Sequence, residues 1–428
     1  MSFSRLVVLP PGNNAAAYPV DLLLWRIGVE NQMSRNILIA GFPRRELLRA
    51  ARETGLHAYV MHDGTDWGSP DETYELLGGH ITDVEDVLSA AAVCDPVGVI
   101  AASEEAVVAV AKAANEIGLP GVSPWAATRT RNKVALRQAL SAKGLPNPVY
   151  REAIDPDEAE KAARELGLPV IVKPVDGYAG LGVSRVDHAE DMALAFPLAQ
   201  RHSAQGVVII EAYLDGPEFS VEGIKVDGEF YVFAIAGRER MDSAHPCTKA
   251  VFMPADVTTS TQGSLVAMAR ASLTAIGMMT GPAHVEFIMT DTGPYVIEIG
   301  AYTGAARIES SLVALATGVD TLHSSVRVAI GEALPRFEPE SKGAAACWID
   351  ARPGVVTEIK GIEEARQAPG VECVHVGVQP GESISHVRDC RARDRIGHVL
   401  ATGSSAAEAL ERAKRASGIC RILTQPTR

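Results

Sequence analysis

The sequence lacks any apolar run of the ~18–20 residues that a membrane-spanning helix needs. Its amino terminus, MSFSRLVVLPPGNN, holds a short apolar stretch that Pro10, Pro11 and Gly12 interrupt. This stretch is shorter than the apolar region of a secretory signal. We therefore expect a cytoplasmic protein with no membrane partner.

Positive charge and closely spaced cysteines are also scarce. Lys and Arg total 40 against 53 Asp and Glu, which gives a net charge of −13. This balance argues against a general affinity for nucleic acid, but a bound nucleotide needs only a local basic pocket. The six cysteines show no CxxC spacing. That pattern is typical of reduced cytoplasmic thiols rather than of a zinc site or a disulfide framework.

A dinucleotide fingerprint is missing from the region where it would be expected. Strand patterns at Asn36–Ala40, His57–Met61 and Gly98–Ala101 are separated by helical patterns. Such alternation indicates an α/β fold whose parallel sheet is covered on both faces. The first strand–helix turn is Gly41-Phe42-Pro43-Arg44 rather than G-x-G-x-x-G, so we expect neither NAD nor FAD.

Two glutamates, Glu286 and Glu298, are the most informative residues that the sequence does contain. They lie in GPAHVEFIMTDTGPYVIEIG, which has the pattern of two strands around the three-residue loop Asp291-Thr292-Gly293. Such a loop would place Met289 near the level of Val296 and both glutamates on one face. Because like charges across a ladder repel, a divalent cation between them would explain the pair, and oxygen ligands suit Mg²⁺. The alternative is a solvated strand face with two scattered acids.

A glycine-rich loop follows a strand that ends in Lys173. The strand Val170–Lys173 stops at Pro174, and extended structure resumes at Val183–Val186. The loop glycines are Gly177, Gly180 and Gly182. Glycines let backbone N–H groups approach a phosphate, but no Gly-Lys-Ser/Thr leads into a helix as in a Walker loop. The pattern predicts a strand–loop–strand flap, which is either a phosphate-binding element or an ordinary hairpin.

Three further charged residues are candidates for nucleotide contacts. Lys133 begins a helical pattern and could reach the same phosphates; otherwise it is a solvated helix-start lysine. The apolar strand Val207–Ile210 runs into Glu211, which could accept a hydrogen bond from a base amino group. Glu218, seven residues on, could hold ribose hydroxyls. Their neutral interpretations are a strand-end acid and a hairpin-rim acid.

Taken in order, these motifs resemble the ATP-grasp superfamily from about residue 35 to residue 428. The resemblance is carried by Lys133, Lys173 with its glycine flap, Glu211-Ala-Tyr-Leu, Glu218-Phe-Ser-Val-Glu222 and the Glu286/Glu298 pair. Within the superfamily, the stretch GPAHVEF…VIEIG…ALATGVD is similar to the L-amino acid ligases, or dipeptide synthases, and their biosynthetic relatives.

The resemblance implies five segments with mixed α/β structure. They are an N-terminal extension (1–33), a Rossmann-like pre-grasp domain (34–120), the small lid subdomain (121–215), the large ATP-grasp subdomain (216–335) and a C-terminal α+β lobe (336–428).

It also implies a role for each matching residue. Lys133 and Lys173 would contact ATP phosphates under the flap Gly177–Gly182, Glu211 with Tyr213 and Leu214 would hold adenine, and Glu218 would hold ribose. Glu286 and Glu298 would hold Mg²⁺, with Mn²⁺ as an alternative. Lys249 falls where such ligases often place a phosphate- or substrate-facing residue. His284 would line the substrate site; alternatively it is a buried imidazole bonded to backbone.

One departure from the family pattern concerns catalysis. The family commonly has an Asn two positions and an Arg four positions after the second glutamate, where this chain has Gly300 and Tyr302. Arg307 lies just downstream and is our candidate for the missing cation. It could instead form a structural pair with Glu309 or Asp320.

The resemblance implies an ATP-dependent carboxylate–amine ligase. An acyl phosphate would form, an amine would attack it, and ADP and phosphate would be released, with small-molecule carboxylate and amine substrates and a homodimer as in relatives. The alternatives are transfer of the acyl group to a thiol or carrier protein, carboxylation with bicarbonate, and a nucleotide-binding regulatory protein without turnover.

Overall fold

The computed structural model describes residues 35–42, 44–62, 74–241, 243–302, 307–337 and 341–426, with the backbone alone for 307–309. The predicted N-terminal extension, residues 1–33, lies outside the described residues. The chain divides into two compact units. The first holds the described residues up to Gly121 together with Leu322–Leu334, and the second holds the remainder. No helix among the described residues has the length and apolar character needed to cross a membrane.

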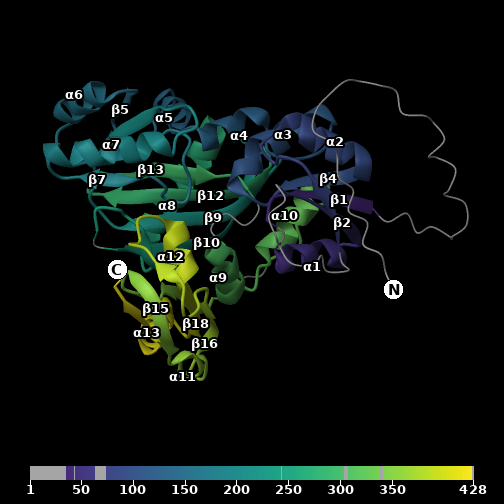
Figure 1. The fold of residues 1–428 in the computed structure, drawn as a ribbon. Helices are drawn as coiled ribbons and strands as arrows, with labels where there is room; N and C mark the ends of the chain where they lie inside the picture. The colour runs from purple at the N-terminus through teal and green to yellow at the C-terminus, as the bar shows by residue number, and fades with distance from the viewer. Residues whose placement is uncertain are drawn as a thin grey trace, which may run out of the picture. The chain divides into compact units, whose positions relative to one another are not determined.

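The first unit is built on a four-stranded parallel sheet, as the sequence predicts. Its strand order is β3-β2-β1-β4. The strands are β1 (Arg35–Ala40), β2 (Leu56–His62), β3 (Tyr74–Gly78) and β4 (Pro96–Ala101). Helices α2 (Val84–Cys94) and α3 (Val107–Glu116) lie on one face, and α1 (Arg45–Glu53) and α10 (Thr321–Ala329) on the other (Figure 1). The predicted α/β layering is confirmed, because apolar side chains point from the strands into both helix layers.

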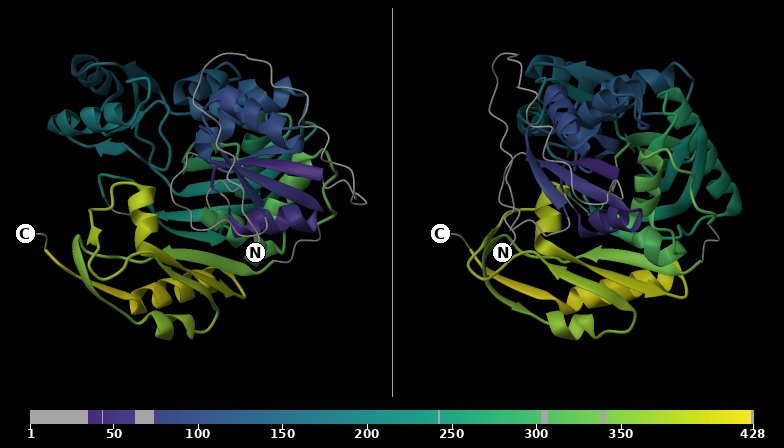
Figure 2. Two further views of the ribbon diagram at one scale, coloured as in Figure 1. Left: turned by 45° about the vertical axis from the view of Figure 1, so that its right-hand side comes forward. Right: turned by 90° about the vertical axis from the view of Figure 1, so that its right-hand side faces the viewer.

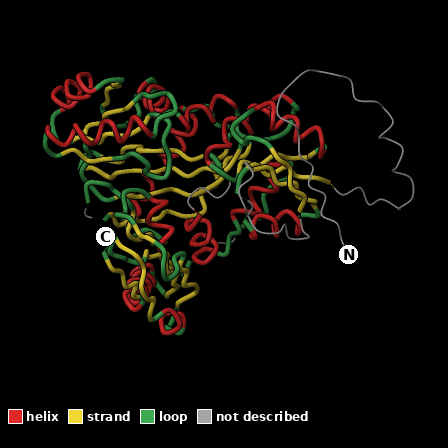
Figure 3. The backbone as a smooth tube through the Cα atoms, viewed as in Figure 1, coloured by secondary structure: helices red, strands yellow, loops and turns green. Residues whose placement is uncertain are grey.

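A small antiparallel sheet carries the flap. Its order is β5-β8-β6-β7, with β5 (Tyr150–Ala153), β6 (Val170–Pro174), β7 (Ser184–Val186) and β8 (Val208–Ala212). Helices α6 (Pro156–Leu166) and α7 (Met192–Arg201) cover it (Figure 3). Because β6 and β7 pair antiparallel, the predicted strand–loop–strand flap is confirmed. The strand runs one residue further than predicted, through Pro174, which pairs with Val208.

An eight-stranded sheet forms the centre of the second unit. Its order is β13-β12-β9-β10-β11-β14-β18-β16. The strands are β9 (Glu218–Val226), β10 (Glu229–Arg240), β11 (Thr248–Met253), β12 (Gly281–Thr290), β13 (Gly293–Gly300), β14 (Gly343–Trp348), β16 (Val371–Val376) and β18 (Gly397–Gly403). The C-terminal strands thus continue the sheet that holds the two glutamates (Figure 2).

Helices cover the large sheet unevenly. Helix α8 (Thr259–Ala275) packs on the apolar face of β9, β12 and β13. Helix α13 (Ala406–Ile419) packs against β11 and β14 on the same face of the sheet as α8. Helix α9 (Arg307–Thr317) packs against the opposite face of these strands. The second unit also contains α4 (Pro124–Arg131), α5 (Lys133–Ser141), α11 (Ile362–Arg366), α12 (Cys390–Ile396) and a small sheet of β15 (Gly354–Lys360), β17 (Ser383–Ile384) and β19 (Arg421–Gln425).

The hairpin that carries the two glutamates is closed by two residues, not by the three that we predicted. Thr290 pairs with Gly293, so the loop contains only two residues, and Met289 pairs with Pro294. Gly293 has a φ of 120°, the positive value predicted for it. By side-chain parity alone, this shorter loop would send the glutamates to opposite faces.

A β-bulge reverses that outcome. Phe287 pairs with Val296, but the next residue along β12, Glu286, pairs with Glu298. Ile297 is therefore the extra residue on β13. One additional residue shifts the parity once more, so both glutamates face the same side. The predicted juxtaposition is confirmed, although the predicted loop is wrong.

Candidate active site

The candidate site lies on the face of the large sheet that α8 leaves uncovered. Glu286 pairs with Glu298 on one side and with Ser220 of β9 on the other, and residues paired across strands share a face. The neighbouring residue Phe287 points the opposite way, into the core under α8. Strict alternation therefore separates the apolar core from a row of charged side chains.

Glu286 is surrounded by positive charge. Arg238 of β10 places Nη1 2.9 Å from Glu286 Oε1, and His284 Nε2 lies 2.9 Å from the same oxygen. Burial alone would raise the pKa of this carboxyl, but Arg238 and His284 outweigh burial and hold the pKa well below its usual range. Glu286 is therefore an anion throughout the neutral range.

His284 lies between two carboxylates. Its Nδ1 is 2.7 Å from one oxygen of Glu222 and 2.9 Å from the other, while Nε2 contacts Glu286. Burial opposes the charged form, yet Glu222 and Glu286 raise the pKa of the imidazole well above its usual value. Both ring nitrogens donate when the ring is protonated. His284 thus contacts two carboxylates rather than backbone, and both carboxylates favour the protonated form of the ring.

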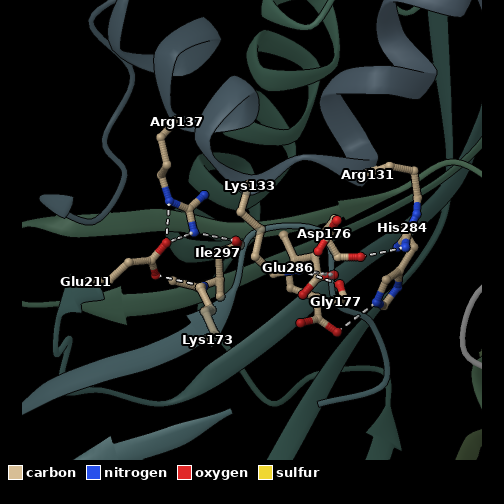
Figure 4. A network of polar contacts seen from close by, with 11 residues as sticks. Arg131, Lys133, Arg137, Lys173, Asp176, Gly177, Glu211, His284, Glu286 and Ile297 are labelled. Atoms are coloured by element: carbon tan, nitrogen blue, oxygen red, sulfur yellow. Dashed lines mark hydrogen bonds and ion pairs between the residues drawn. The ribbon is translucent and has the colours of Figure 1, made fainter. Parts of the chain in front are cut away.

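Lys133 connects the flap with the second glutamate. It is the first residue of α5, and its Nζ donates to the backbone oxygen of Gly177 at 2.7 Å. The same nitrogen lies 3.6 Å from Glu298 Oε1. Lys133, from a helix start, thus lies within contact of both a glycine of the flap and one glutamate of the pair. Figure 4 shows Lys133 beside Gly177.

Glu211 lies in a buried ion network. Its Oε2 is 2.7 Å from Lys173 Nζ, and its Oε1 accepts from Arg137 Nε at 2.9 Å. Arg137 also donates to the backbone oxygen of Ile297 at 2.7 Å, the bulged residue of β13 (Figure 4). The side-chain carboxylate that we predicted at the adenine is therefore fully engaged by two cations, and the bulge supplies the second acceptor for Arg137.

The charges of this network influence one another. Burial would raise the pKa of Glu211, but Arg137 and Lys173 outweigh it and lower the pKa. Burial lowers the pKa of Lys173, and the nearby Arg137 and Lys133 lower it further, against the opposing effect of Glu211. A buried carboxylate between two buried cations is stable only while all three charges are present, because removing one leaves another without compensation.

The remaining predicted residues are less closely associated with the pair. Glu218 faces the same side, with Arg240 Nη1 at 3.4 Å; burial raises its pKa, Arg240 opposes that rise and Glu286 adds to it. Tyr213 stacks under the guanidinium of Arg185 at 4.2 Å, and Leu214 beside it is half-buried.

Lys249 is exposed at a bulge of β11. Burial raises the pKa of the Cys347 thiol, and the charge of Lys249 opposes that rise. Cys347 packs under α13. In the described part of the chain, no hydrogen bond or ion pair joins Lys249 to either glutamate. The side chain of Arg307, for which we predicted a catalytic role, lies outside the described part of the structure.

Comparisons with known proteins agree with this architecture. Residues 166–310 match the ATP-grasp domain family, and residues 348–424 match L-amino acid ligase C-terminal domain 2. The crystal structure of the L-amino acid ligase from Bacillus licheniformis has the same fold, with a TM-score of 0.77, 22% identity, and coverage of 92% of this chain and 99% of that one.

The chain therefore contains an ATP-grasp domain. An uncharacterized protein of Sinorhizobium fredii, y4rH, is 33% identical over 320 residues, which are 74% of this chain and 66% of that protein. The D-alanine–D-alanine ligase of Mycolicibacterium smegmatis is 33% identical over 211 residues, which are 45% of this chain and 55% of the ligase. The matches to these two proteins each span less than two thirds of the relative's own length.

The donor set of this ATP-grasp site suits a hard cation. Among the residues that the structure describes, no cluster of three or more His, Cys, Asp and Glu side chains could hold a metal ion. Mg²⁺ commonly uses only one or two carboxylates and completes its shell with water and phosphate oxygens. Two facing glutamates meet that requirement. Ser220, paired with Glu286, has a buried Oγ without a hydrogen-bond partner within the described residues. A phosphate or water oxygen bound at this site could accept its hydrogen bond.

Sequence reasoning assigned no role to four residues of this ATP-grasp site. They are Arg137, Glu222, Arg238 and Arg240. Parity along β9 puts Glu222 on the face of Glu218, and that signal was available once the strand was assigned. The three arginines had no such signal, because their partners lie in other elements.

Proposed function

We propose that the protein is an ATP-dependent ligase that joins a small carboxylate to an amine, with amino acids as its substrates. The observation that carries the proposal is the Glu286–Glu298 pair with Lys133 between Glu298 and the flap. Two carboxylates facing each other repel unless a cation lies between them. The lysine and the flap then provide the opposite side of a phosphate-binding site.

The chemistry follows from the weakness of a carboxylate as an electrophile. The carboxylate oxygen attacks the γ-phosphoryl group of ATP, ADP leaves, and an acyl phosphate forms. The amine then attacks the acyl carbon, an amide bond forms, a proton is lost from the amine, and phosphate departs. Each step spreads negative charge over oxygens, so positioned cations stabilise the transition states.

The chain's residues have distinct parts in this scheme. Lys133 and Lys173 neutralise phosphate charge, and the flap excludes water that would hydrolyse the acyl phosphate. Glu286 and Glu298 would hold Mg²⁺, which when bound neutralises phosphate charge. The backbone near Tyr213 and Leu214 would hold the adenine.

A second candidate is a nucleotide-binding regulatory protein without turnover. Gly300 and Tyr302 favour it, since they occupy the positions of the usual Asn and Arg. Incubation with ATP, Mg²⁺ and a panel of carboxylates and amines separates the two functions. Phosphate release that depends on the amine supports the ligase; ATP binding without phosphate release across the panel supports regulation. Acyl transfer to an added thiol or carrier would instead favour the thiol pathway.

Arg307 is the proposed source of the missing cation. If its guanidinium stabilises the oxyanion formed during amine attack, Arg307→Met lowers turnover far more than ATP affinity, by about 100-fold or more, as for other oxyanion donors. Steady-state kinetics with ATP varied give both quantities. A lower melting temperature with turnover preserved would instead assign Arg307 to a structural ion pair.

Arg238→Met is the matched variant for that experiment. Arg238 is the buried arginine already 2.9 Å from Glu286. If turnover falls in Arg238→Met and not in Arg307→Met, the cation comes from β10 instead.

A further inference from the structure

The flap loop rests on the first residues of α12, a helix of the C-terminal region. The backbone N–H of Cys390 donates to the backbone oxygen of Ala179 at 2.9 Å. The guanidinium of Arg391 donates to the hydroxyl of Tyr178 and lies 4.6 Å from the centre of its ring. A Cβ on Gly180 would lie 3.8 Å from the sulfur of Cys390. Two successive flap residues, Tyr178 and Ala179, therefore contact two successive residues of α12, and Gly180 lies close by.

A second arginine also lies close to the Tyr178 ring. Arg131, the last residue of α4, places its guanidinium 5.3 Å from the ring centre. Its Nη2 donates to the backbone oxygen of Asp176 at 2.8 Å, at the start of the flap loop (Figure 4). The tyrosine ring thus lies near two arginines, one from the lid region and one from the C-terminal region.

The backbone of the flap is held in an uncommon conformation at this place. Ala179 has a φ of 52° and Gly180 a φ of 70°. A left-handed conformation costs a residue with a Cβ about 1–2 kcal/mol. It persists where surrounding contacts define it. The hydrogen bond from Cys390 is one such contact at Ala179.

We propose that α12 is a latch for the flap and that Arg391 is its positioning residue. Arg391 holds Tyr178, and through Tyr178 it sets how firmly the loop closes over bound nucleotide. The nucleotide part of this inference rests on the proposed function; the contact itself does not. The inference also gives a role to the region that matches the ligase C-terminal domain, since α12 lies within residues 348–424.

The latch predicts a specific effect of Arg391→Met. Without nucleotide, amide hydrogen exchange of residues 177–183 should become about fivefold to tenfold faster, since a cation–π contact and a charged hydrogen bond are lost. With ATP, the KM for ATP should rise by a similar factor. Phosphate release without amine should also increase, because a looser flap admits water.

Arg395→Met is the matched control. Arg395 lies on the same helix but pairs with Glu382 at 3.3 Å, and both side chains are exposed. This variant should leave flap exchange and the KM unchanged. Tyr178→Phe tests the latch from the other partner: it keeps the ring, loses the hydroxyl and should give an intermediate increase in exchange.

The exchange measurement decides the inference independently of enzyme activity. Flap exchange in Arg391→Met equal to that of the wild type would overturn the latch, and so would an equal increase in Arg395→Met. If Arg391→Met unfolds, the exchange of Tyr178→Phe decides in the same way. An inactive wild type would refute the ligase proposal, while faster flap exchange in Arg391→Met would still establish the latch.

Discussion

Replacing Glu298 by Gln is expected to reduce turnover with ATP and Mg²⁺ by more than about 100-fold. Changes in residues that only support a metal ligand already cost about 10-fold to 100-fold, and Glu298 is a proposed ligand itself. The substitution keeps the shape of the side chain and removes its charge. It also removes the repulsion from Glu286, its partner across the ladder. It also breaks the ion pair with the buried Lys133, whose Nζ lies 3.6 Å from Glu298. Relief of the repulsion and loss of this pair act in opposite directions, so the melting temperature should change little.

ADP release as a function of Mg²⁺ concentration measures this effect. Glu239→Gln provides the control, because Glu239 lies on β10 of the same sheet and pairs with Lys414 at 2.7 Å rather than with a residue of the site. Circular dichroism and the melting temperature report on the fold of both variants. Near-normal turnover in Glu298→Gln would remove Glu298 from the metal site and with it the main support for the proposed function.

Replacing Glu211 by Gln is expected to have the largest effect on stability. Glu211 is 3% exposed and is bonded to both Arg137 and Lys173. Removing its charge leaves two buried cations without compensation. Breaking a buried ion pair in this way costs about 3–5 kcal/mol of unfolding free energy. Urea denaturation followed by a probe in the flap sheet measures that loss.

A surface pair in the same sheet region supplies the comparison. Arg151 and Glu165 lie 2.9 Å apart and are both largely exposed, so Glu165→Gln should cost less than about 1 kcal/mol. Adding Lys173→Met to Glu211→Gln should recover part of the loss, since one uncompensated cation is removed. Equal losses for Glu211→Gln and Glu165→Gln would contradict the buried network.

The stability deficit of Glu211→Gln should also depend on pH. Arg137 and Lys173 lower the pKa of Glu211 in the folded protein despite burial. A lowered carboxyl pKa contributes stability above the unfolded value of about 4.3 and loses it as the pH falls through the folded value. The difference between wild type and variant should therefore be largest near neutral pH and shrink below about pH 4. A constant difference would mean that charge is not its cause.

The glutamate hairpin shows where sequence reasoning succeeds and where it stops. Alternation of apolar and polar residues identifies both strands. The charged residues Glu286 and Glu298 identify the face of the sheet that carries the site. The number of loop residues was not determined, because Asp291-Thr292-Gly293 is compatible with two closures. Only the bulge at Ile297 fixes the register. Its carbonyl also binds Arg137, so the bulge connects the glutamate pair to the lid.

By itself, the sequence determined the strand and helix pattern, the flap, the ordered set of motifs and the superfamily. These depend on residues close together in the chain, whose spacing follows the periods of strands and helices. The tertiary structure alone decided that Arg238 reaches Glu286, that Glu211 is buried between two cations and that Arg391 lies on Tyr178. Those contacts join residues that are far apart in the chain. Their partners are set by sheet order and strand register, which no local pattern encodes.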